Sequence, residues 1–473
     1  VVGGNVADPL HSPSQQPLVG VVVVEERDTL PGPAAELAQV VGGGGREHAI
    51  CWKLAQSEKV DKIFCAPGNA GIAKAAECVA VGAEDIDGIC GFAKENDIDL
   101  AVIGPEVPLA MGIVDELEAA GVKTFGPNKK CSQLEASKSF TKDFLARHQI
   151  PTAGYKEFTD KQELLDAVGI FGYPMVLKAD GLAAGKGVVI AENEADAKKA
   201  IEEMMGDKVF GHAADKIVVE EFLTGVEASM LCFVDENTIL PMESAQDYKR
   251  AFDDDKGPNT GGMGTYSPSL LFDEKIEDEI RSQILEPTLA GFQKDGLDFK
   301  GVLFIGLMLS EDGPKVIEFN NRFGDPETQS VLARLESDLA EVFLAVTENR
   351  LAQVELKWKK EKAVCVVLAS GGYPGSYEKG KLISGLGNVD PDVIVFHAGT
   401  KFAEMPEGSK CAACEDGCEM KQSAIVTSGG RVLGVTALGK THEEARAKAY
   451  ANAEKITFDG VQYRKDIGLI HRG

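Results

Sequence analysis

Short apolar runs separated by glycine-containing turns organise the first part of the chain. Runs at 39–41, 62–66 and 100–103 each stop at a turn rich in glycine or proline, and helix-like residues follow the first of them at 49–56. Strands that repeatedly end in such turns are typical of a parallel sheet with helices on both faces. This pattern predicts a doubly wound N-terminal α/β domain over residues 36–137.

A second pattern follows a helix predicted at 134–148. Strands at 175–177 and 188–190 flank a glycine-rich loop, and strands at 301–309 and 315–319 are joined by a tight turn. Paired strands of this kind predict an α+β region in the middle of the chain.

The two ends of the chain differ from this middle. Residues 1–35 are interrupted by prolines and contain one strand-like run at 21–24, which predicts a poorly ordered extension. A charged stretch with little helical pattern at 351–361 predicts a domain boundary. The residues at 356–473 mix strands with glycine turns and are predicted to form a small β-rich C-terminal domain. Together these segments predict a multidomain α/β and α+β protein.

Composition and charge narrow the kind of partner. The chain has 473 residues, 44% of them hydrophobic, which suffices for several folded cores. The net charge of −26 argues against wrapping nucleic acid or lying on an anionic membrane. The longest apolar run, near 302–309, is far shorter than a membrane span. A phosphate-bearing substrate would therefore need locally clustered Lys and Arg.

Ten cysteines are scattered over the chain. Seven lie in apolar or helical contexts, which predicts buried, reduced thiols; they are Cys51, Cys65, Cys78, Cys90, Cys131, Cys232 and Cys365. The other three, Cys411, Cys414 and Cys418, lie in an acidic loop. Three thiolates suit Zn²⁺, but no fourth ligand is near, so a surface insertion with free thiols is favoured over a metal site.

The stretch at 316–327 places polar groups at the end of an apolar strand. Because alternate side chains of a strand share a face, Glu318 and Asn320 are predicted to point the same way. A carboxylate and a carboxamide are hard oxygen ligands that suit Mg²⁺ held together with substrate phosphates. Arg322, Asp325 and Glu327 follow at once, so five polar or charged groups converge at the end of this strand. The alternative is a sheet edge with solvated charges.

Two glycine-rich segments are candidates for phosphate binding. Residues 42–45 join a strand to a helix, where backbone N–H groups bind anions. They are not the dinucleotide fingerprint, because the acidic ribose contact expected about 20 residues later is missing; a plain tight turn is the alternative.

The loop at 178–187 carries Lys178 and Lys186. It is not a Walker loop, since no Gly-Lys-Ser/Thr opens a helix, and a hairpin loop without function is the alternative.

Two further segments carry candidate contacts to a nucleotide or substrate. Backbone groups at 220–223 follow a strand and can pair with an adenine edge, and Glu227 can accept from ribose hydroxyls. A solvated strand end is the alternative there. The connection at 247–264 is long and glycine-rich, and such loops inside a compact domain are usually functional. Lys249 and Arg250 supply positive charge in it.

Together these motifs resemble those of the phosphoribosylamine–glycine ligase family, which are ATP-grasp enzymes of purine biosynthesis. The resemblance runs from about residue 40 to the end of the chain. It rests on the segments 43–49, 66–71, 104–106, 134–138, 178–187, 257–264, 318–327, 371–375, 397–401 and 464–468. The strand before the first glycine turn departs from the family pattern, because Glu36 and Gln39 are polar.

The resemblance implies that ATP, glycine and 5-phosphoribosylamine give ADP, phosphate and glycinamide ribonucleotide through a glycyl phosphate. It implies an ATP-grasp domain at 138–350 with a mobile lid at about 153–222, and the cofactors ATP and Mg²⁺ or Mn²⁺. The implied metal ligands are Glu318 and Asn320, and the implied catalytic residues are Arg322, Lys178 and Asp325. The implied nucleotide contacts are Lys138, Lys178, Gly185, Lys186, Gly187, Glu220, Glu221, Phe222 and Glu227. The implied substrate contacts are Gly45, Arg46, Asn69, Glu106, Lys249, Arg250, Asn259 and Gly261.

Three other functions compete with this one. They are another ATP-grasp carboxylate–amine ligase with a different acceptor, a nucleotide-binding regulator without catalysis, and a dinucleotide-dependent oxidoreductase. The regulator is disfavoured because no metal ligand or loop lysine is missing. The expected partners are small molecules, with neither nucleic acid nor a membrane. We expect a monomer in the cytoplasm, with a plastid as the alternative compartment.

Overall fold

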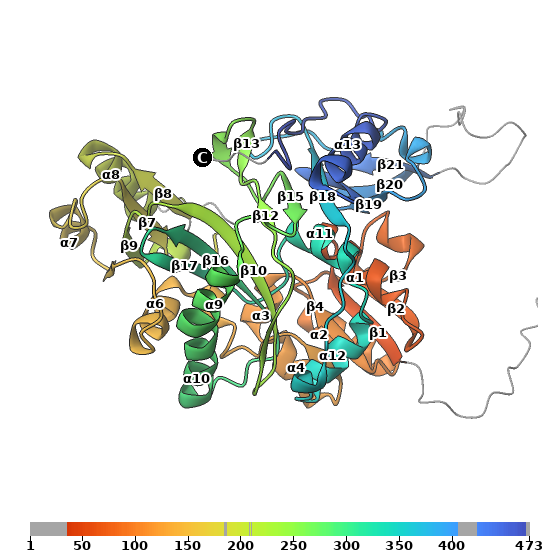
Figure 1. Cartoon of the computed structure of the whole chain (residues 1–473), viewed down its shortest axis with the longest axis horizontal. Coiled ribbons are helices and arrows are strands. Elements are labelled where there is room, and N and C mark those ends of the chain that lie inside the picture. Colours follow the sequence, from red (N-terminus) through yellow and green to blue (C-terminus); the bar gives the residue numbers. More distant parts are fainter. Residues whose placement is uncertain (1–35, 184–186, 208, 210, 405–422, 470–473) are drawn as a thin grey trace, which may run out of the picture. The chain divides into compact units, whose positions relative to one another are not determined.

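The computed structural model describes residues 36–183, 187–207, 209, 211–404 and 423–469 (Figure 1). The predicted extension at 1–35, the loop residues Gly185 and Lys186, and the cluster Cys411, Cys414 and Cys418 lie outside these residues. Within the described part, no helix has the length and apolar character needed to cross a membrane.

The N-terminal region contains a parallel five-stranded sheet in the order β3-β2-β1-β4-β5 (Figure 1). Helix α1 contributes Ile50 and Leu54 to the core on one face, and α2 and α4 contribute Ile89 and Leu117 to the core on the other. This confirms the predicted parallel sheet with helices on both faces. The elements are β1 (Glu36–Gly42), α1 (Gly45–Leu54), β2 (Val60–Pro67), η1 (Ile72–Lys74), β3 (Glu77–Cys78), α2 (Ile86–Glu95), β4 (Leu100–Ile103), α3 (Glu106–Met111), α4 (Ile113–Ala119) and β5 (Lys123–Phe125).

Strand β1 is central in this sheet in spite of its polar residues. It pairs with β2 on one side and with β4 on the other. Ala38, Val40 and Val41 are fully buried, as expected of a parallel strand covered on both faces. Gln39 is fully buried as well, and its amide makes no hydrogen bond. Burial of the apolar neighbours therefore places β1 at the centre of the sheet, and Gln39 is buried because it lies between them.

A four-stranded antiparallel sheet, in the order β6-β9-β7-β8, forms the region predicted as a lid. The prediction of a single helix at 134–148 is wrong, because the helix is interrupted at Ser137. This residue adopts an extended conformation and caps a new helix, since its side chain accepts a hydrogen bond from the N–H of Phe140. The elements are α5 (Gln133–Ala136), α6 (Lys138–Arg147), β6 (Tyr155–Phe158), α7 (Lys161–Asp166), β7 (Met175–Ala179), β8 (Val188–Ala191), α8 (Glu194–Ile201), η2 (Glu202–Gly206), η3 (Gly211–Ala214) and β9 (Ile217–Glu221).

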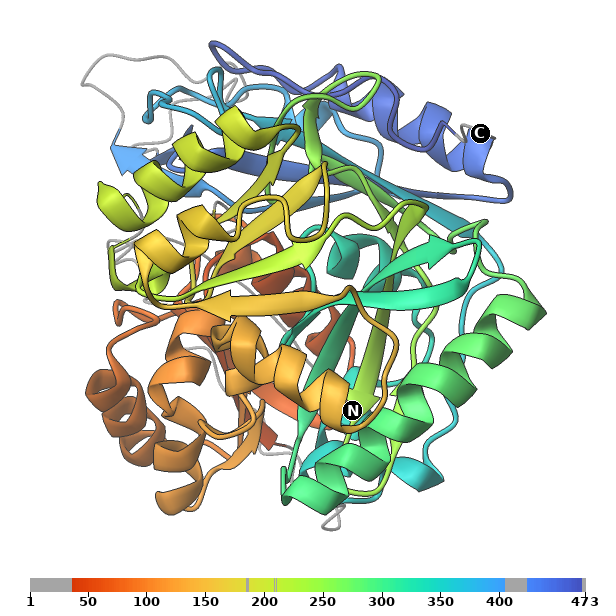
Figure 2. The same cartoon turned by 90° about the vertical axis from the view of Figure 1, so that its left-hand side faces the viewer.

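A second antiparallel sheet has the order β11-β10-β16-β17. Its strands are β10 (Val226–Val234), β11 (Ile239–Pro241), β16 (Gly301–Ser310) and β17 (Gly313–Asn320), and the predicted pairing of the last two is confirmed. Three consecutive helical segments form one rod whose apolar side packs on this sheet (Figure 2). They are α9 (Glu274–Ile280), η4 (Arg281–Leu285) and α10 (Glu286–Asp295).

The C-terminal sheet has the order β12-β15-β18-β22-β19. Strands β13 and β14 form a hairpin inside the connection predicted as a loop at 247–264, and β12 and β15 overlap its two ends, so that prediction is wrong for those residues. The elements are β12 (Gln246–Asp247), β13 (Arg250–Phe252), β14 (Lys256–Asn259), β15 (Gly264–Ser267), α11 (Glu327–Arg334), α12 (Leu339–Thr347), η5 (Leu351–Gln353), β18 (Lys362–Ala369), η6 (Leu386–Asn388), β19 (Ile394–His397), β20 (Thr400–Glu404), β21 (Ser423–Thr427), β22 (Arg431–Gly439) and α13 (His442–Ala453).

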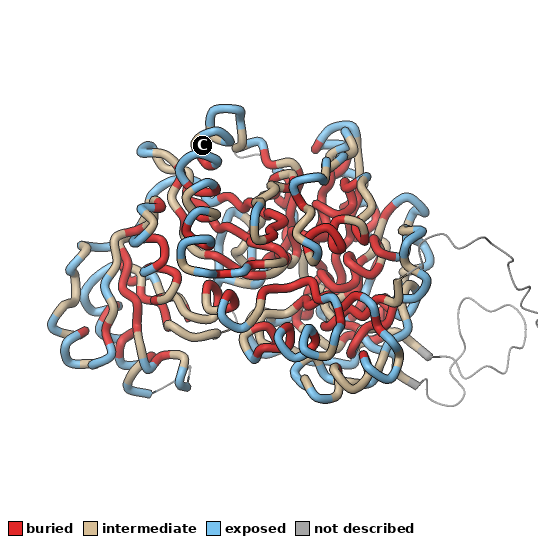
Figure 3. Tube along the Cα trace, turned by 90° about the horizontal axis from the view of Figure 1, so that it is seen from below, coloured by how far each residue is buried: buried red, intermediate tan, exposed pale blue. Residues whose placement is uncertain are grey.

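Buried residues lie in the interior of the described part, and exposed residues lie mainly at its periphery (Figure 3). The cysteine prediction is correct for Cys51, Cys65, Cys131, Cys232 and Cys365, which are buried free thiols. It is wrong for Cys78, which is exposed, and for Cys90, which is half-buried. Cys78 lies on the two-residue strand β3, which forms the edge of the sheet among the described residues.

Candidate active site

Strand β17 presents the two predicted metal ligands on one face, and a bulge just before them turns Val316 to the other face. Strict alternation would place Val316 on the same face as Glu318 and Asn320. The pairing with β16 instead shifts register at Ile317, which is the extra residue. Val316 and Phe319 therefore both enter the core. Glu318 and Asn320 line a cavity on the other face, with Asn320 Nδ2 at 3.4 Å from Glu318 Oε1.

This cavity has a volume of about 460 Å³. It lies among the N-terminal sheet, the lid sheet, β17 and the C-terminal sheet, so residues far apart in the sequence meet in its wall. The predicted site residues that line it are Arg46, Glu106, Lys138, Gly187, Lys249, Gly261, Glu318, Asn320, Arg322 and Asp325. The structure thus brings ten of the predicted site residues into one place.

Glu318 lies among lysine side chains. Lys138 Nζ, at the start of α6, is 3.2 Å from Glu318 Oε2. Burial works against ionisation of Glu318, but Lys138 and Lys249 outweigh it and hold the pKa of the carboxyl well below its usual range. Glu318 in turn raises the pKa of Lys138 against the effect of burial. The cavity therefore holds a charged carboxylate beside charged ammonium groups.

Arg322 follows β17 and bridges two acidic residues of the N-terminal half. Its Nη2 lies 3.1 Å from Glu135 Oε1, and its Nε lies 3.6 Å from Glu106 Oε2. Burial opposes ionisation of Glu106, but Arg322 and Arg46 lower its pKa. Glu135 is more deeply buried, and burial raises its pKa in spite of Arg322. These contacts fix the guanidinium in the cavity wall.

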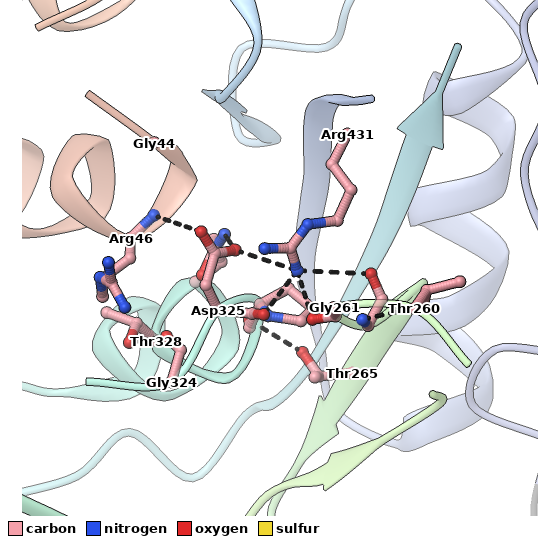
Figure 4. A network of polar contacts seen from close by, with 12 residues as sticks. Gly44, Arg46, Thr260, Gly261, Thr265, Gly324, Asp325, Thr328 and Arg431 are labelled. Carbon is pink, nitrogen blue, oxygen red and sulfur yellow. Dashed lines mark hydrogen bonds and ion pairs between the residues drawn. The ribbon is translucent and has the colours of Figure 1, made fainter. Parts of the chain in front are cut away.

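Asp325 connects the end of β17 to both α1 and β22 (Figure 4). Its Oδ2 lies 3.4 Å from the backbone N of Arg46. Its Oδ1 lies 3.6 Å from Arg431 Nη1 and accepts a hydrogen bond from Gln329 Nε2 at 2.8 Å. Arg431 Nη1 also donates to the carbonyl oxygens of Asp325, at 2.5 Å, and of Gly261. Burial opposes ionisation of Asp325, but Arg431 and Arg46 lower its pKa. Arg431 thereby holds two loops of the cavity together.

A second cavity, of about 330 Å³, adjoins the first, since Asp325 and Arg431 line both. Its wall contains glycine turns of the first sheet and residues 398–400 of the C-terminal domain. Asn69 lies in this wall with its side chain fully engaged. Its Nδ2 donates to the carbonyls of Gly43 and His397, and its Oδ1 accepts from two backbone N–H groups of its own loop. Asn69 therefore shapes this cavity by joining two domains.

Two carboxylates, Asp247 and Glu327, line the first cavity beside Lys249. Burial raises the pKa of Asp247, and the nearby Glu327 raises it further. Burial also raises the pKa of Glu327. One carboxylate oxygen of Asp247, Oδ1, is buried without a hydrogen-bond partner. This pair favours a positively charged group over an anion at its end of the cavity.

The root of the glycine-rich loop at 178–187 is held against α6 and β17. Lys178 Nζ, on β7, lies 2.9 Å from Glu220 Oε1 on β9 and 3.3 Å from the carbonyl oxygen of Ile317. Asp180 Oδ1 accepts from the backbone N–H of Ser139 at 2.7 Å. These contacts hold the first residues of the loop in place. Residues 181–183 and 187 of the loop line the cavity.

Several predicted site residues lie outside both cavities; they are Gly45, Lys178, Glu220, Glu221, Phe222, Glu227, Arg250 and Asn259. Glu227 is nevertheless connected to the site, because its Oε2 lies 3.0 Å from Lys249 Nζ. Arg250 and Asn259 face each other in the separate β13–β14 hairpin, where Arg250 Nη1 donates to the carbonyl of Gly257. The structure therefore does not place these two side chains in the wall of either cavity.

Sequence reasoning missed several residues of the first cavity. Glu135 and Asp247 stand within segments that the motifs singled out, so their charge was a usable signal. Glu327 was recognised at the end of the strand but was given no role. Arg431 carries no comparable signal, because it is 106 residues from Asp325 and follows no recognised motif.

The site fits a divalent cation only together with further ligands. Among the described residues there is no group of three or more His, Cys, Asp or Glu side chains arranged to hold a metal ion. Glu318 and Asn320 supply two oxygen ligands beside several cationic side chains. That donor set fits Mg²⁺, which is commonly held by one or two carboxylates plus substrate phosphates.

Two antiparallel sheets enclose a cavity lined by lysines and by a carboxylate–carboxamide pair, and a family model described as an ATP-grasp domain matches these residues. The biotin carboxylase of Campylobacter jejuni shares this fold, with a TM-score of 0.66 and 16% identity over 92% of this chain and 94% of that one. Family models described as the N, ATP-grasp (A) and C domains of phosphoribosylglycinamide synthetase match residues 38–135, 136–328 and 363–470.

Individual relatives give the same assignment. The phosphoribosylamine–glycine ligases of Caldanaerobacter subterraneus and Vibrio vulnificus are each 49% identical to this chain; the alignments cover 90% and 91% of it and 98% and 97% of those proteins. The crystal structure of the ligase from Thermotoga maritima has a TM-score of 0.76 and 32% identity, and the match covers 91% of this chain and 100% of that one. The chain belongs to the phosphoribosylamine–glycine ligase family.

Proposed function

We propose that the chain joins glycine to 5-phosphoribosylamine at the expense of ATP, giving glycinamide ribonucleotide for purine biosynthesis. The observation that carries this proposal is the cavity in which Glu318, Asn320 and Arg322 meet lysines from two other elements. That arrangement is suited to phosphoryl transfer, in which positioning and charge stabilisation supply most of the catalysis. Family membership selects this ligase reaction among those that such a cavity can support.

We place the ATP phosphates between the lid loop and β17. Lys138 and the backbone at Gly187 line this part of the cavity, and Glu318 and Asn320 would hold Mg²⁺ there. When bound, the metal ion would neutralise charge on the phosphate oxygens. The adenine is assigned to the hinge after β9, where the strand ends at Glu221. The lid would exclude water from the reacting groups.

The chemistry proceeds in two displacements. A carboxylate oxygen of glycine attacks the γ-phosphorus, the bond to ADP breaks, and glycyl phosphate forms. The amine of phosphoribosylamine then attacks the carbonyl carbon, loses a proton, and displaces inorganic phosphate. Arg322, fixed by Glu106 and Glu135, is placed to stabilise negative charge on the transferring phosphoryl group.

The two substrates other than ATP are assigned from charge and position. Asp247 and Glu327 are proposed to receive the ammonium group of glycine, since this end of the cavity favours a cation. The sugar phosphate is assigned to the adjoining cavity, where glycine turns let a ligand approach the backbone closely and Arg431 adds positive charge. Arg431 and Asp325 border both cavities, so the two substrates would meet there.

A coupled assay of ADP release tests the proposed function. We expect ADP to appear only when glycine and 5-phosphoribosylamine are both present, in a one-to-one ratio with glycinamide ribonucleotide. Ammonia, other amines and ribose 5-phosphate, each used in place of phosphoribosylamine, serve as controls. They show whether the enzyme releases ADP with a different acceptor. ADP release that depends on another amine, or on neither substrate, would overturn the assignment.

A further inference from the structure

Lys142 is a buried charged residue that the reaction described above does not use. It lies on α6, and its side chain is only 3% exposed. Its Nζ is 3.0 Å from Glu220 Oε2 on β9 and 2.8 Å from Thr152 Oγ1. A buried lysine loses much of its solvation, so a site that keeps one needs a compensating interaction. Here that interaction is the pair with Glu220.

Glu220 is shared between two lysines. Lys178 Nζ lies 2.9 Å from its Oε1 and donates to its Oε2 at 3.0 Å, and Lys142 Nζ lies 3.0 Å from the same Oε2. All three side chains are at most 5% exposed. Two ammonium groups and one carboxylate leave the cluster with one net positive charge. Lys178 also contacts the carbonyl of Ile317, next to Glu318 on β17, so this charge stands directly behind the predicted phosphate site.

We propose that Lys142 is a positioning residue for the nucleotide, which neutralises Glu220 so that the positive charge of Lys178 stays available to the ATP phosphates. This inference rests on the proposed function, because it takes the cavity beside β17 as the nucleotide site. With Lys142 uncharged, Lys178 and Glu220 form a neutral pair, and the cluster no longer attracts an anion. Lys142 itself need not touch the nucleotide.

The charge of Lys142 is expected to depend on pH. Burial and the neighbouring Lys178 lower the pKa of Lys142 to about 8, while Glu220 and Glu221 of β9 oppose that change. The other groups that face it are the ring of Tyr155 on β6, at 5.9 Å, and the carbonyl of Ala153. Burial, together with Asp143, raises the pKa of Tyr155 to about 12, so this phenol stays neutral. The cluster is therefore positive below about pH 8 and loses that charge above it.

The dissociation constant of MgADP, measured by calorimetry between pH 7 and 9.5, tests the proposal. The wild-type protein is expected to bind MgADP about tenfold more weakly at pH 9.5 than at pH 7, because one nearby positive charge is lost. The midpoint of this change should lie near pH 8. Lys142→Met should bind weakly at every pH. Lys142→Arg keeps its charge throughout and should bind tightly at every pH. Lys156→Met, at an exposed position of the same sheet, is the matched control and should follow the wild type.

The outcomes separate this inference from the proposed function. Wild-type affinity that is constant across this pH range would overturn the role of Lys142, and so would a Lys142→Met variant with the wild-type profile. Absence of MgADP binding to the wild type at every pH would instead overturn the nucleotide site itself. Melting temperatures show whether each variant is folded. If Lys142→Arg does not fold, because arginine does not fit the buried position, the comparison of the wild-type and Lys142→Met pH profiles alone tests the role of Lys142.

Discussion

Replacing Glu318 with glutamine is expected to lower kcat by roughly 10²–10³-fold or more, because the charged ligand of the cation on β17 is lost. The side chain keeps its size, so the shared face with Asn320 and the bulge at Ile317 should persist. Excess positive charge from Lys138 and Lys249 would then be uncompensated in the free protein. The measurement is kcat at saturating ATP, glycine and phosphoribosylamine over a Mg²⁺ titration.

The matched control for this variant is Glu311→Gln, at the exposed turn between β16 and β17 of the same hairpin. It removes the same charge away from the cavity, and its kcat should stay within about twofold of the wild type, as is usual for surface substitutions. A Glu318→Gln protein that reaches normal turnover at high Mg²⁺ would show that this carboxylate is not an essential ligand.

Replacing Arg322 with methionine is expected to lower kcat by about 10³-fold, the usual scale for an arginine that stabilises charge on a transferring phosphoryl group. Lysine should recover only part of this loss, because one ammonium group cannot reproduce the planar contacts to Glu106 and Glu135. The loss should appear in kcat more than in the KM for ATP, since the interaction strengthens in the transition state.

Removing Arg322 also leaves Glu135 buried without its ion-pair partner, so protein stability must be measured alongside activity. Arg281→Met, at an exposed position on η4, is the control for loss of a guanidinium elsewhere. Turnover of folded Arg322→Met within a few-fold of the wild type would exclude a role for this side chain in phosphoryl transfer.

Local patterns were sufficient to predict much of the fold and part of the site. Alternation identified Glu318 and Asn320 as neighbours, and the structure keeps them together. The same rule could not show that Val316 faces the opposite side, because a bulge depends on the partner strand β16. The helix at 134–148 failed for a local reason, since Ser137 is a strong helix cap inside an otherwise helical pattern.

The residues that sequence reasoning could not place are those defined by distant partners. Lys178 and Glu220 were assigned to the nucleotide, but their pairing with each other and with Lys142 exists only once β7, β9 and α6 are packed. Arg431 reaches Asp325 and Gly261 from another domain. Such contacts follow from tertiary structure, and no periodicity within a short window reports them.

The most direct test of the central claim uses glycine labelled with ¹⁸O in both carboxylate oxygens. The account requires that one of these oxygens attacks phosphorus and later leaves with it. Inorganic phosphate from a complete reaction should therefore carry one ¹⁸O atom per molecule, measured by mass spectrometry, and glycinamide ribonucleotide should retain the other. Phosphate without the label, formed together with the ligated product, would contradict activation of glycine by phosphoryl transfer in this cavity.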